Sequence, residues 1–177
     1  MKVILHICCG VCAAGAAEVL LSENHRVTGY FYNPNIYPYA EYQRRLDTAV
    51  KVAAQLDFPI EAGQYDSDNW MVDAEPFKNE PEGGQRCLLC YRIRLQNTYN
   101  FMLSQNADAF TTTLTIGPSK SAARINEIGQ TIGGDKFLPR DFKKKDGFKR
   151  AIARSNQWQL YRQNYCGCVY SVRGNAT

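Results

Sequence analysis

The chain begins with a short apolar run that ends in three cysteines. Residues 3–7 (VILHI) are mostly β-branched or otherwise apolar, and Cys8, Cys9 and Cys12 follow within a few positions. A run of this kind is typical of a strand buried in a parallel sheet. Ligands of open α/β sheets bind beyond the carboxyl ends of the strands. The start of the chain therefore predicts a central strand that delivers thiols to a binding site.

Strand-like and helix-like segments alternate along the rest of the chain. The further strand patterns occupy residues 25–32, 59–65, 107–114 and 135–139. The helix patterns occupy residues 10–23, 39–56, 66–78, 85–102, 121–131 and 147–156. Because each crossover is long enough to hold a helix, this order predicts an α/β fold of three layers, αβα, around a central five-stranded and mainly parallel sheet.

A single domain is expected from the length of 177 residues. Residues 1–139 are expected to form its α/β core, and residues 140–177 a basic segment and a C-terminal extension that is helical and bears cysteines. No run reaches the roughly 18 apolar residues that a membrane-spanning helix needs, and the first residues do not resemble a signal peptide. We therefore expect a cytoplasmic protein that does not engage a membrane.

The seven cysteines form three short motifs, at residues 8–12, 87–90 and 166–168. A disulfide framework is excluded because the number is odd and the expected compartment is reducing. An isolated cysteine is most often a small buried hydrophobe, but these spacings are typical of metal ligation or redox chemistry. The second motif also follows two glycines at the start of a predicted helix, where backbone N–H groups and the helix dipole are expected to lower the pKa of its thiols.

The number of thiols favours iron over zinc. A structural zinc site closes with four ligands and leaves none over, whereas an iron-sulfur cluster takes four thiolates and leaves the others free for redox work or a second metal. The choice of ligands stays open, because Cys8 and Cys9 point to opposite faces if the strand continues and Cys9 can pair with Cys12 instead. Cys166 and Cys168 can ligate a metal or form a strained, reducible disulfide.

Positive charge is concentrated near the end of the chain. Residues 140–154 contain seven basic and two acidic side chains, a local net charge of +5 in a chain whose net charge is +4. Such a concentration favours a polyanion as partner, although solvated charge runs are common on protein surfaces.

Several of these segments together resemble epoxyqueuosine reductase of the QueH type. The resemblance rests on the cysteine motif at 8–12, RCLLCYRIRL at 86–95, TTL at 112–114 with PSK at 118–120, DFKK at 141–144 with GF at 147–148, and YRQNYCGC at 161–168. These motifs span nearly the whole chain, so their conjunction is specific.

The resemblance implies a HUP-like, Rossmann-like fold, an iron-sulfur cluster of the 4Fe-4S kind and the last step of queuosine biosynthesis. In that step the epoxide of epoxyqueuosine, at the wobble position of a tRNA anticodon, is reduced to an alkene. The implied partners are a tRNA with a queuosine-type anticodon and an electron donor that the sequence does not identify. ATP is not expected, because cysteines take the place of the phosphate-binding loop after the first strand.

The resemblance also implies roles for the cysteines. The cluster ligands would be Cys8, Cys9, Cys87 and Cys90. Cys166 and Cys168 would act as a redox-active pair or ligate a second iron or other metal ion, and Cys12 would either ligate that metal as well or take no part.

Further site residues come from the same motifs and from the basic segment. Asp141 is the expected proton donor, ahead of Tyr165 and of His6, which is better explained as a core residue satisfied by a hydrogen bond. The expected substrate-binding residues are Tyr32, Lys120, Lys143, Lys144, Lys145 and Arg162, with Tyr37, Tyr39 and Tyr161 as further platforms for unpaired bases.

Two other functions compete with this interpretation. One is a zinc-stabilised RNA-binding module without chemistry of its own. The other is a thiol-disulfide oxidoreductase that uses Cys166 and Cys168 without iron.

Overall fold

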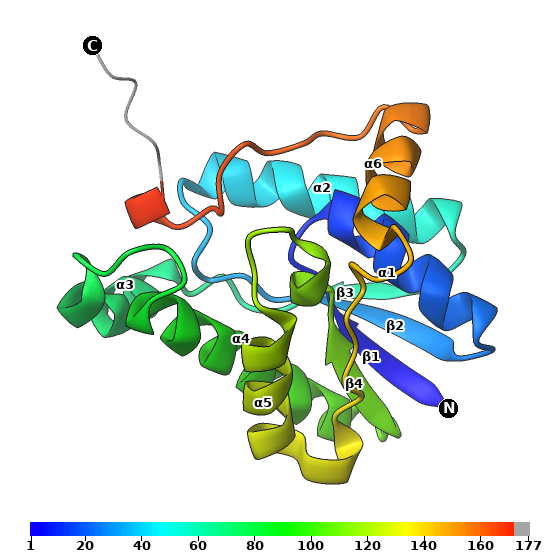
Figure 1. Cartoon of the computed structure of the whole chain (residues 1–177), viewed down its shortest axis with the longest axis horizontal. Coiled ribbons are helices and arrows are strands. Elements are labelled where there is room, and N and C mark those ends of the chain that lie inside the picture. The colour runs from blue at the N-terminus through cyan, green and yellow to red at the C-terminus, as the bar shows by residue number, and fades with distance from the viewer. Residues whose placement is uncertain (172–177) are drawn as a thin grey trace.

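A four-stranded parallel sheet forms the centre of the protein (Figure 1). The computed structural model describes residues 1–171, so residues 172–177 of the expected C-terminal extension lie outside the described part. The strands are β1 (Lys2–His6), β2 (Arg26–Phe31), β3 (Ile60–Ala62) and β4 (Ala109–Thr112), in the spatial order β3-β2-β1-β4. The parallel sheet and the interior position of the first strand are thus confirmed.

The expected fifth strand is reduced to a single bridge. Gly134–Lys136 forms a 3-10 helix, and only Phe137 then pairs with Phe110 of β4. The Leu138 N–H donates to the Phe110 carbonyl at 2.8 Å, but Pro139 has no N–H with which to extend the ladder. The prediction of five strands is therefore wrong by this one edge element.

Helices cover both faces of the sheet (Figure 1). One face carries α1 (Gly10–Ser22), α2 (Tyr39–Gln55) and α6 (Gly147–Gln157). The other carries α4 (Gln85–Ser104) and α5 (Ala122–Gly133), with α3 (Ser67–Ala74) and the 3-10 turn Glu75–Phe77 beside α4. Each face has its own apolar core, as the three-layer prediction requires.

Small residues let α1 lie close to its neighbours. Ala13, Ala14, Ala16 and Ala17 are fully buried. A Cβ atom on Gly15 would come within 2.6 Å of the Ile116 side chain. The Ala-rich pattern of this helix thus reflects close packing between α1, α2 and α6.

The register of the sheet places several chain segments at one end of it. His6, the last residue of β1, lies opposite Tyr30 of β2 and Thr112 of β4. Because the strands are parallel, the residues that follow each strand meet at the same edge. Cys8, Asn33 and Thr113 therefore come together although they are far apart in the sequence.

The C-terminal segment returns to that edge after α6 (Figure 1). Residues 158–168 have no regular structure, and a 3-10 turn, Val169–Ser171, follows. The Gly167 carbonyl accepts from the Tyr37 N–H at 2.9 Å, and Arg45 donates to the carbonyls of Tyr165 and Cys166. The third cysteine motif is thereby fixed over the carboxyl ends of the strands.

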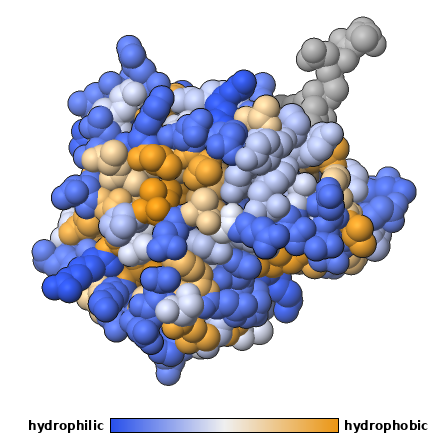
Figure 2. Space-filling model, turned by 180° about the vertical axis from the view of Figure 1, so that it is seen from behind, coloured by the Kyte–Doolittle hydropathy of each residue, from blue (hydrophilic) through white to orange (hydrophobic). Residues whose placement is uncertain are grey.

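The surface is largely hydrophilic, with an apolar area on the side shown in Figure 2. Within residues 1–171, no helix combines the length and the apolar character that crossing a membrane requires.

Candidate metal centre and substrate cavity

Three thiols meet where β1 ends. The Sγ atoms of Cys8, Cys9 and Cys12 all lie within 4.8 Å of one another. The strand stops at His6, and Cys9 caps α1 with an extended backbone while its Sγ accepts the Cys12 N–H at 3.4 Å. The chain thus leaves the strand before Cys8, which removes the objection that neighbouring cysteines face opposite sides. The group contains both pairs of candidate ligands that the sequence left open, Cys8 with Cys9 and Cys9 with Cys12.

The group favours a negative charge at Cys8. Hydrogen bonds from Cys12 and Cys9 lower the pKa of the Cys8 thiol well below its usual range, and the hydrogen bond to Cys8 raises the pKa of Cys12. Thr113 supports the same atom, because its hydroxyl donates to Cys8 Sγ at 3.1 Å and accepts the Cys8 N–H at 3.0 Å. A thiolate is the form of cysteine that binds a metal.

The second motif lies on the first turns of α4 and is buried. The Gly83 N–H donates to Cys87 Sγ at 3.2 Å, and the Arg94 guanidinium lies 3.9 Å from Cys90 Sγ. Burial nevertheless raises the pKa of Cys87, and it raises the pKa of Cys90 to about 11. The expectation that the helix start lowers these pKa values is therefore wrong, because desolvation outweighs the backbone donor. Without a metal these are neutral thiols.

The third motif approaches the second. Negative charge at Cys166 and at Cys168 contributes to raising the pKa of both Cys87 and Cys90, after the larger effect of burial. Cys168 packs with Cys90 in a small cluster beside Trp70. All seven cysteines are free thiols, so the disulfide considered for Cys166 and Cys168 is not formed.

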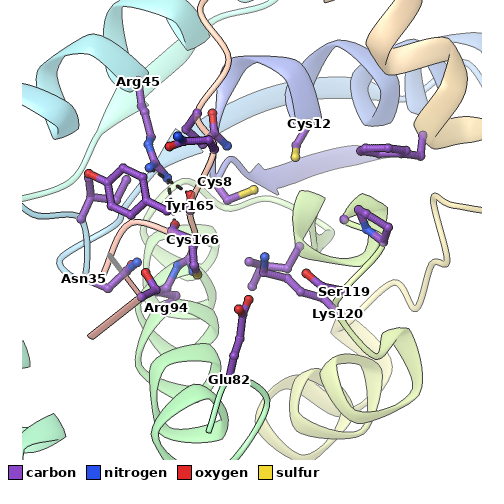
Figure 3. Close-up of a pocket in the computed structure, with 18 residues that line it drawn as sticks. Cys8, Cys12, Asn35, Arg45, Glu82, Arg94, Ser119, Lys120, Tyr165 and Cys166 are labelled. Carbon is purple, nitrogen blue, oxygen red and sulfur yellow. Dashed lines mark hydrogen bonds between the residues drawn. The ribbon is translucent and has the colours of Figure 1, made fainter. Parts of the chain in front are cut away.

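A cavity of about 310 Å³ opens between the first and third motifs (Figure 3), and Cys87 and Cys90 of the second motif are not part of its wall. Its wall includes Cys8 and Cys12 from the start of the chain and Cys166 from its end. The other polar side chains that line it include Asn35, Arg45, Glu82, Arg94, Ser119, Lys120 and Tyr165. The volume is that of a small-molecule site, so the thiols face a space that a substrate group can enter.

Lys120 gives this cavity a positive charge. Burial works to lower the pKa of its ammonium, but negative charge at Cys166 and Cys8 outweighs it and raises that pKa. Lys120 therefore stays protonated and offers hydrogen-bond donors toward the thiols.

His6 is a neutral core residue. Its Nδ1 lies 2.8 Å from the Thr112 hydroxyl and its Nε2 lies 3.1 Å from the Tyr32 carbonyl. Burial, reinforced by the charge of Arg94, lowers the pKa of His6 to about 3. The interpretation of His6 as a satisfied core residue is confirmed.

Asp141 and Lys143 lie beside the cavity rather than in its wall. An Asp141 carboxylate oxygen accepts the Lys143 N–H at 3.2 Å. The Lys143 ammonium donates to the carbonyls of Thr115 and Lys120 at 3.2 and 2.8 Å. Both residues thus hold the loop that carries Lys120.

The remaining predicted substrate residues are Lys144, Lys145, Arg162 and Tyr32. Lys144, Lys145 and Arg162 are exposed, and Tyr32 is half-buried with its ring stacked beside Tyr30 at 6.1 Å. None of these four lines the cavity, so their role in substrate binding stays a prediction.

Three residues of the site have no assigned role in the sequence pattern. Thr113 and Arg94 occur inside the motifs that carry the resemblance, but nothing in the motifs indicates their contacts. Asn35 belongs to a turn-forming stretch that carries no further signal. In the structure its side-chain oxygen is buried, and no hydrogen-bond partner for it exists among the described residues.

Comparison with known proteins identifies the family. The family profile described as epoxyqueuosine reductase QueH matches residues 3–174. The chain belongs to the epoxyqueuosine reductase QueH family. One relative of that name, from Staphylococcus epidermidis, is 38% identical over 97% of this chain and 76% of its own length. Another, from Thermotoga maritima, is 33% identical over 96% of this chain and 90% of its own.

Solved structures support the fold of this QueH family member. The U34-tRNA thiolase NcsA from Methanococcus maripaludis, solved with its [4Fe-4S] cluster, aligns with a TM-score of 0.60 at 15% identity over 98% of this chain and 62% of that one. A predicted subunit of a tRNA methyltransferase from Methanocaldococcus jannaschii aligns with a TM-score of 0.56 at 13% identity, over 86% of this chain and 74% of that one. At these identities the likeness concerns the α/β fold, which is confirmed.

Proposed function

We propose that this chain reduces the epoxide of epoxyqueuosine in tRNA to the alkene of queuosine. Family membership confirms the expected class, an oxidoreductase of queuosine biosynthesis whose substrate is tRNA. The observation that carries the proposal for this chain is the cavity in which thiols of the first and last cysteine motifs face the Lys120 ammonium. The reaction takes up two electrons and two protons, breaks both C–O bonds of the epoxide, forms the C=C bond and releases water.

The donor set fits an iron-sulfur cluster. Three thiols converge at the end of β1, and the pKa of one of them is already low. The buried Arg94, which lies 3.9 Å from Cys90 Sγ of the second motif, supports an anionic group. We assign Cys8, Cys9, Cys87 and Cys90 as ligands of a 4Fe-4S cluster, which would supply electrons one at a time.

The third motif has a separate proposed role. Cys166 and Cys168 act as a redox-active pair or ligate a second iron or other metal ion, to which Cys12 also contributes. The observation that supports this role is that Cys166 and Cys12 both line the cavity. The electron donor is a separate component, and ATP takes no part in the proposed reaction.

Residues of the cavity bind and orient the substrate. The Lys120 ammonium donates to the epoxide oxygen as negative charge develops on it. Asn35 offers a buried acceptor to an N–H or O–H group of the modified base, which would satisfy its oxygen. Asp141 remains the predicted acid if the bound substrate reaches its carboxylate, and an Asp141→Asn variant with unaltered turnover would exclude that role.

The exposed cations bind the tRNA backbone. The exposed cations are Lys144, Lys145, Lys149, Arg150 and Arg162, and their exposure leaves their charges accessible to phosphates. Tyr37 and Tyr39 are 44% and 56% exposed, so their rings are accessible to unpaired bases. Since tRNA maturation takes place in the cytoplasm, that is the compartment we propose.

Nucleoside analysis of tRNA tests the activity. The chain is expressed in a bacterial strain that makes epoxyqueuosine but lacks its own reductase, with a Cys87→Ser variant as control. We expect queuosine to replace epoxyqueuosine with the wild-type chain only. Persistent epoxyqueuosine in cells that contain folded, iron-loaded protein would contradict the proposal.

The purified protein tests the cofactor. After anaerobic reconstitution we expect a brown protein with broad visible absorption, and loss of that absorption in Cys87→Ser. A colourless protein with stoichiometric zinc would identify the zinc-stabilised RNA-binding module instead.

A further inference from the structure

Arg94 is a buried cation at the floor of the cysteine site. Its side chain is on α4, only 2% exposed, and it lines the cavity (Figure 3). Its guanidinium donates to Asn33 Oδ1 at 2.6 Å, lies 3.9 Å from Cys90 Sγ, and lies 3.4 Å from His6 Nε2. None of these three partners is a carboxylate, and within residues 1–171 no acidic side chain forms an ion pair with it.

The other two buried arginines of this region are compensated differently. Arg45 pairs with the Glu41 carboxylate at 2.7 Å. Arg86 donates to three backbone carbonyls, those of Phe77, Lys78 and Glu80. The guanidinium of Arg94 has neither a carboxylate nor a backbone carbonyl as its partner among the described residues, and in this it differs from the other two.

A buried charge without a counter-charge is costly, because the protein interior does not replace the solvation that water gave it. The groups whose negative charge acts most strongly on Arg94 are the thiols of Cys90, Cys8 and Cys166. Glu82 also lines the cavity, but it forms no ion pair with Arg94 among the described residues. When cysteines ligate iron they bind as thiolates, so the negative charge that Arg94 lacks arises when the metal centre forms.

The guanidinium is held in place by the ends of two strands. Asn33, just after β2, accepts from Arg94 through Oδ1 and donates through Nδ2 to the Ile7 carbonyl at 2.9 Å. His6 of β1 bounds the other side and is neutral. This frame directs the charge of Arg94 toward Cys90 and toward the cavity.

We infer that Arg94 is a positioning residue for the cysteine-held cluster, which it neutralises in part and to which it donates an N–H···S hydrogen bond at Cys90. The inference rests on the proposed function, since it presupposes an iron-sulfur cluster. Net charge and hydrogen bonds to the sulfurs set the reduction potential of such clusters. A nearby cation stabilises the reduced, more negative state, so Arg94 raises the potential.

The test compares four reconstituted proteins without tRNA: wild type, Arg94→Met, Arg94→Lys, and Arg92→Met as a matched control. Arg92 lies on the same helix but is exposed. Cluster potentials are measured by redox titration with EPR detection, iron retention by the rate of loss to a chelator, and folding by circular dichroism.

In Arg94→Met we expect the reduced-to-oxidised ratio at a fixed potential to fall about tenfold, a shift of about 59 mV to more negative values. Iron loss to the chelator should be faster in that variant. Arg94→Lys should recover most of the potential, because it keeps the charge, and Arg92→Met should match wild type.

Two different results would overturn the inference, and only one of them would also overturn the proposed cofactor. A wild-type potential in both Arg94 variants would show that Arg94 does not act on the cluster, while the proposed cofactor stands. Wild-type protein that takes up no cluster would overturn the proposed cofactor and this inference with it. If Arg94→Met does not fold, the neutral variant Arg94→Gln takes its place. A potential below those of Arg94→Lys and Arg92→Met supports the inference, and a potential equal to theirs contradicts it.

Discussion

At the scale of single residues, the chemistry of the site depends on which groups surround each thiol. Cys8 and Cys87 are both cysteines in metal-type motifs, yet the pKa of Cys8 is lowered by neighbouring thiols and that of Cys87 is raised by burial. The spacing of the cysteines indicates a metal-type motif in both cases and does not distinguish the two thiols. The difference lies in contacts made across the fold, as with Thr113, which reaches Cys8 from the end of β4.

Thr113→Val tests this contact. The variant keeps the shape of the side chain but removes the hydroxyl that donates to Cys8 Sγ. Since a hydrogen bond to the charged form favours it, we expect the pKa of Cys8 to rise and alkylation of Cys8 by iodoacetamide at neutral pH to slow several-fold in the metal-free protein. The pH profile of alkylation, read by peptide mass spectrometry, measures the shift. Thr131→Val, at an exposed position of α5, is the control, and equal profiles would contradict the prediction.

At the scale of elements, the sequence pattern is sufficient to predict α1, but it predicts only part of what the basic segment does. Helix α1 is fixed by small residues at close contacts, and its Ala-rich pattern is sufficient to predict it. The basic segment is recognised from charge alone, which does not separate Lys143, whose ammonium binds two carbonyls, from the exposed Lys144 and Lys145. Burial and hydrogen bonding within this segment depend on the loop at residues 115–120, which charge counting does not reveal.

Gly10→Ala tests the close approach of α1 to α2. A Cβ at this position would lie 2.4 Å from Thr48 Cγ2 and 2.9 Å from the Thr48 carbonyl oxygen. Because backbone must move to make room, we expect the free energy of unfolding to fall by about 1–3 kcal/mol, measured by urea denaturation. Gly117→Ala is the control, since its Cβ would meet nothing closer than 3.7 Å. Equal stability of the two variants would contradict the packing argument.

The double variant Lys144→Gln, Lys145→Gln tests the tRNA surface. We expect weaker tRNA binding and a less steep salt dependence of the binding constant, because each lysine that no longer neutralises a phosphate lowers the log-log slope by about one unit. The cluster spectrum should not change. Lys136→Gln, an exposed lysine outside the basic segment, is the control. Unaltered affinity at low salt would show that these lysines face solvent in the complex.

At the scale of the whole molecule, the site exists because the chain's two ends meet. The first motif follows β1, and the third is fixed over the same edge by Arg45 of α2, which binds the carbonyls of Tyr165 and Cys166. The cavity wall therefore depends on an interaction between residues about 120 positions apart. Glu41, one turn earlier on the same helix, compensates the charge of Arg45 in a buried ion pair.

Arg45→Met tests this tie. Its removal leaves Glu41, only 6% exposed, with the more distant Arg44 guanidinium at 3.8 Å as its cation. Breaking a buried pair typically costs about 3–5 kcal/mol. We expect a lower free energy of unfolding and faster hydrogen exchange in residues 158–168, followed by mass spectrometry. Lys51→Met, exposed on the same helix, is the control. Unchanged exchange in the C-terminal segment would show that other interactions hold it.

The sequence by itself determined the order of the elements, the parallel sheet, the three cysteine motifs and the family. These follow from signals that are local: apolar periodicity, turn residues and the spacing of thiols. Only the tertiary structure decided that residues 135–139 add no full strand, that Cys8, Cys9 and Cys12 form one group, and that Asp141 lies outside the cavity wall. It also decided that Arg94 is buried without a carboxylate. Burial and electrostatic pairing depend on segments that are distant in the chain, so no local pattern carries them.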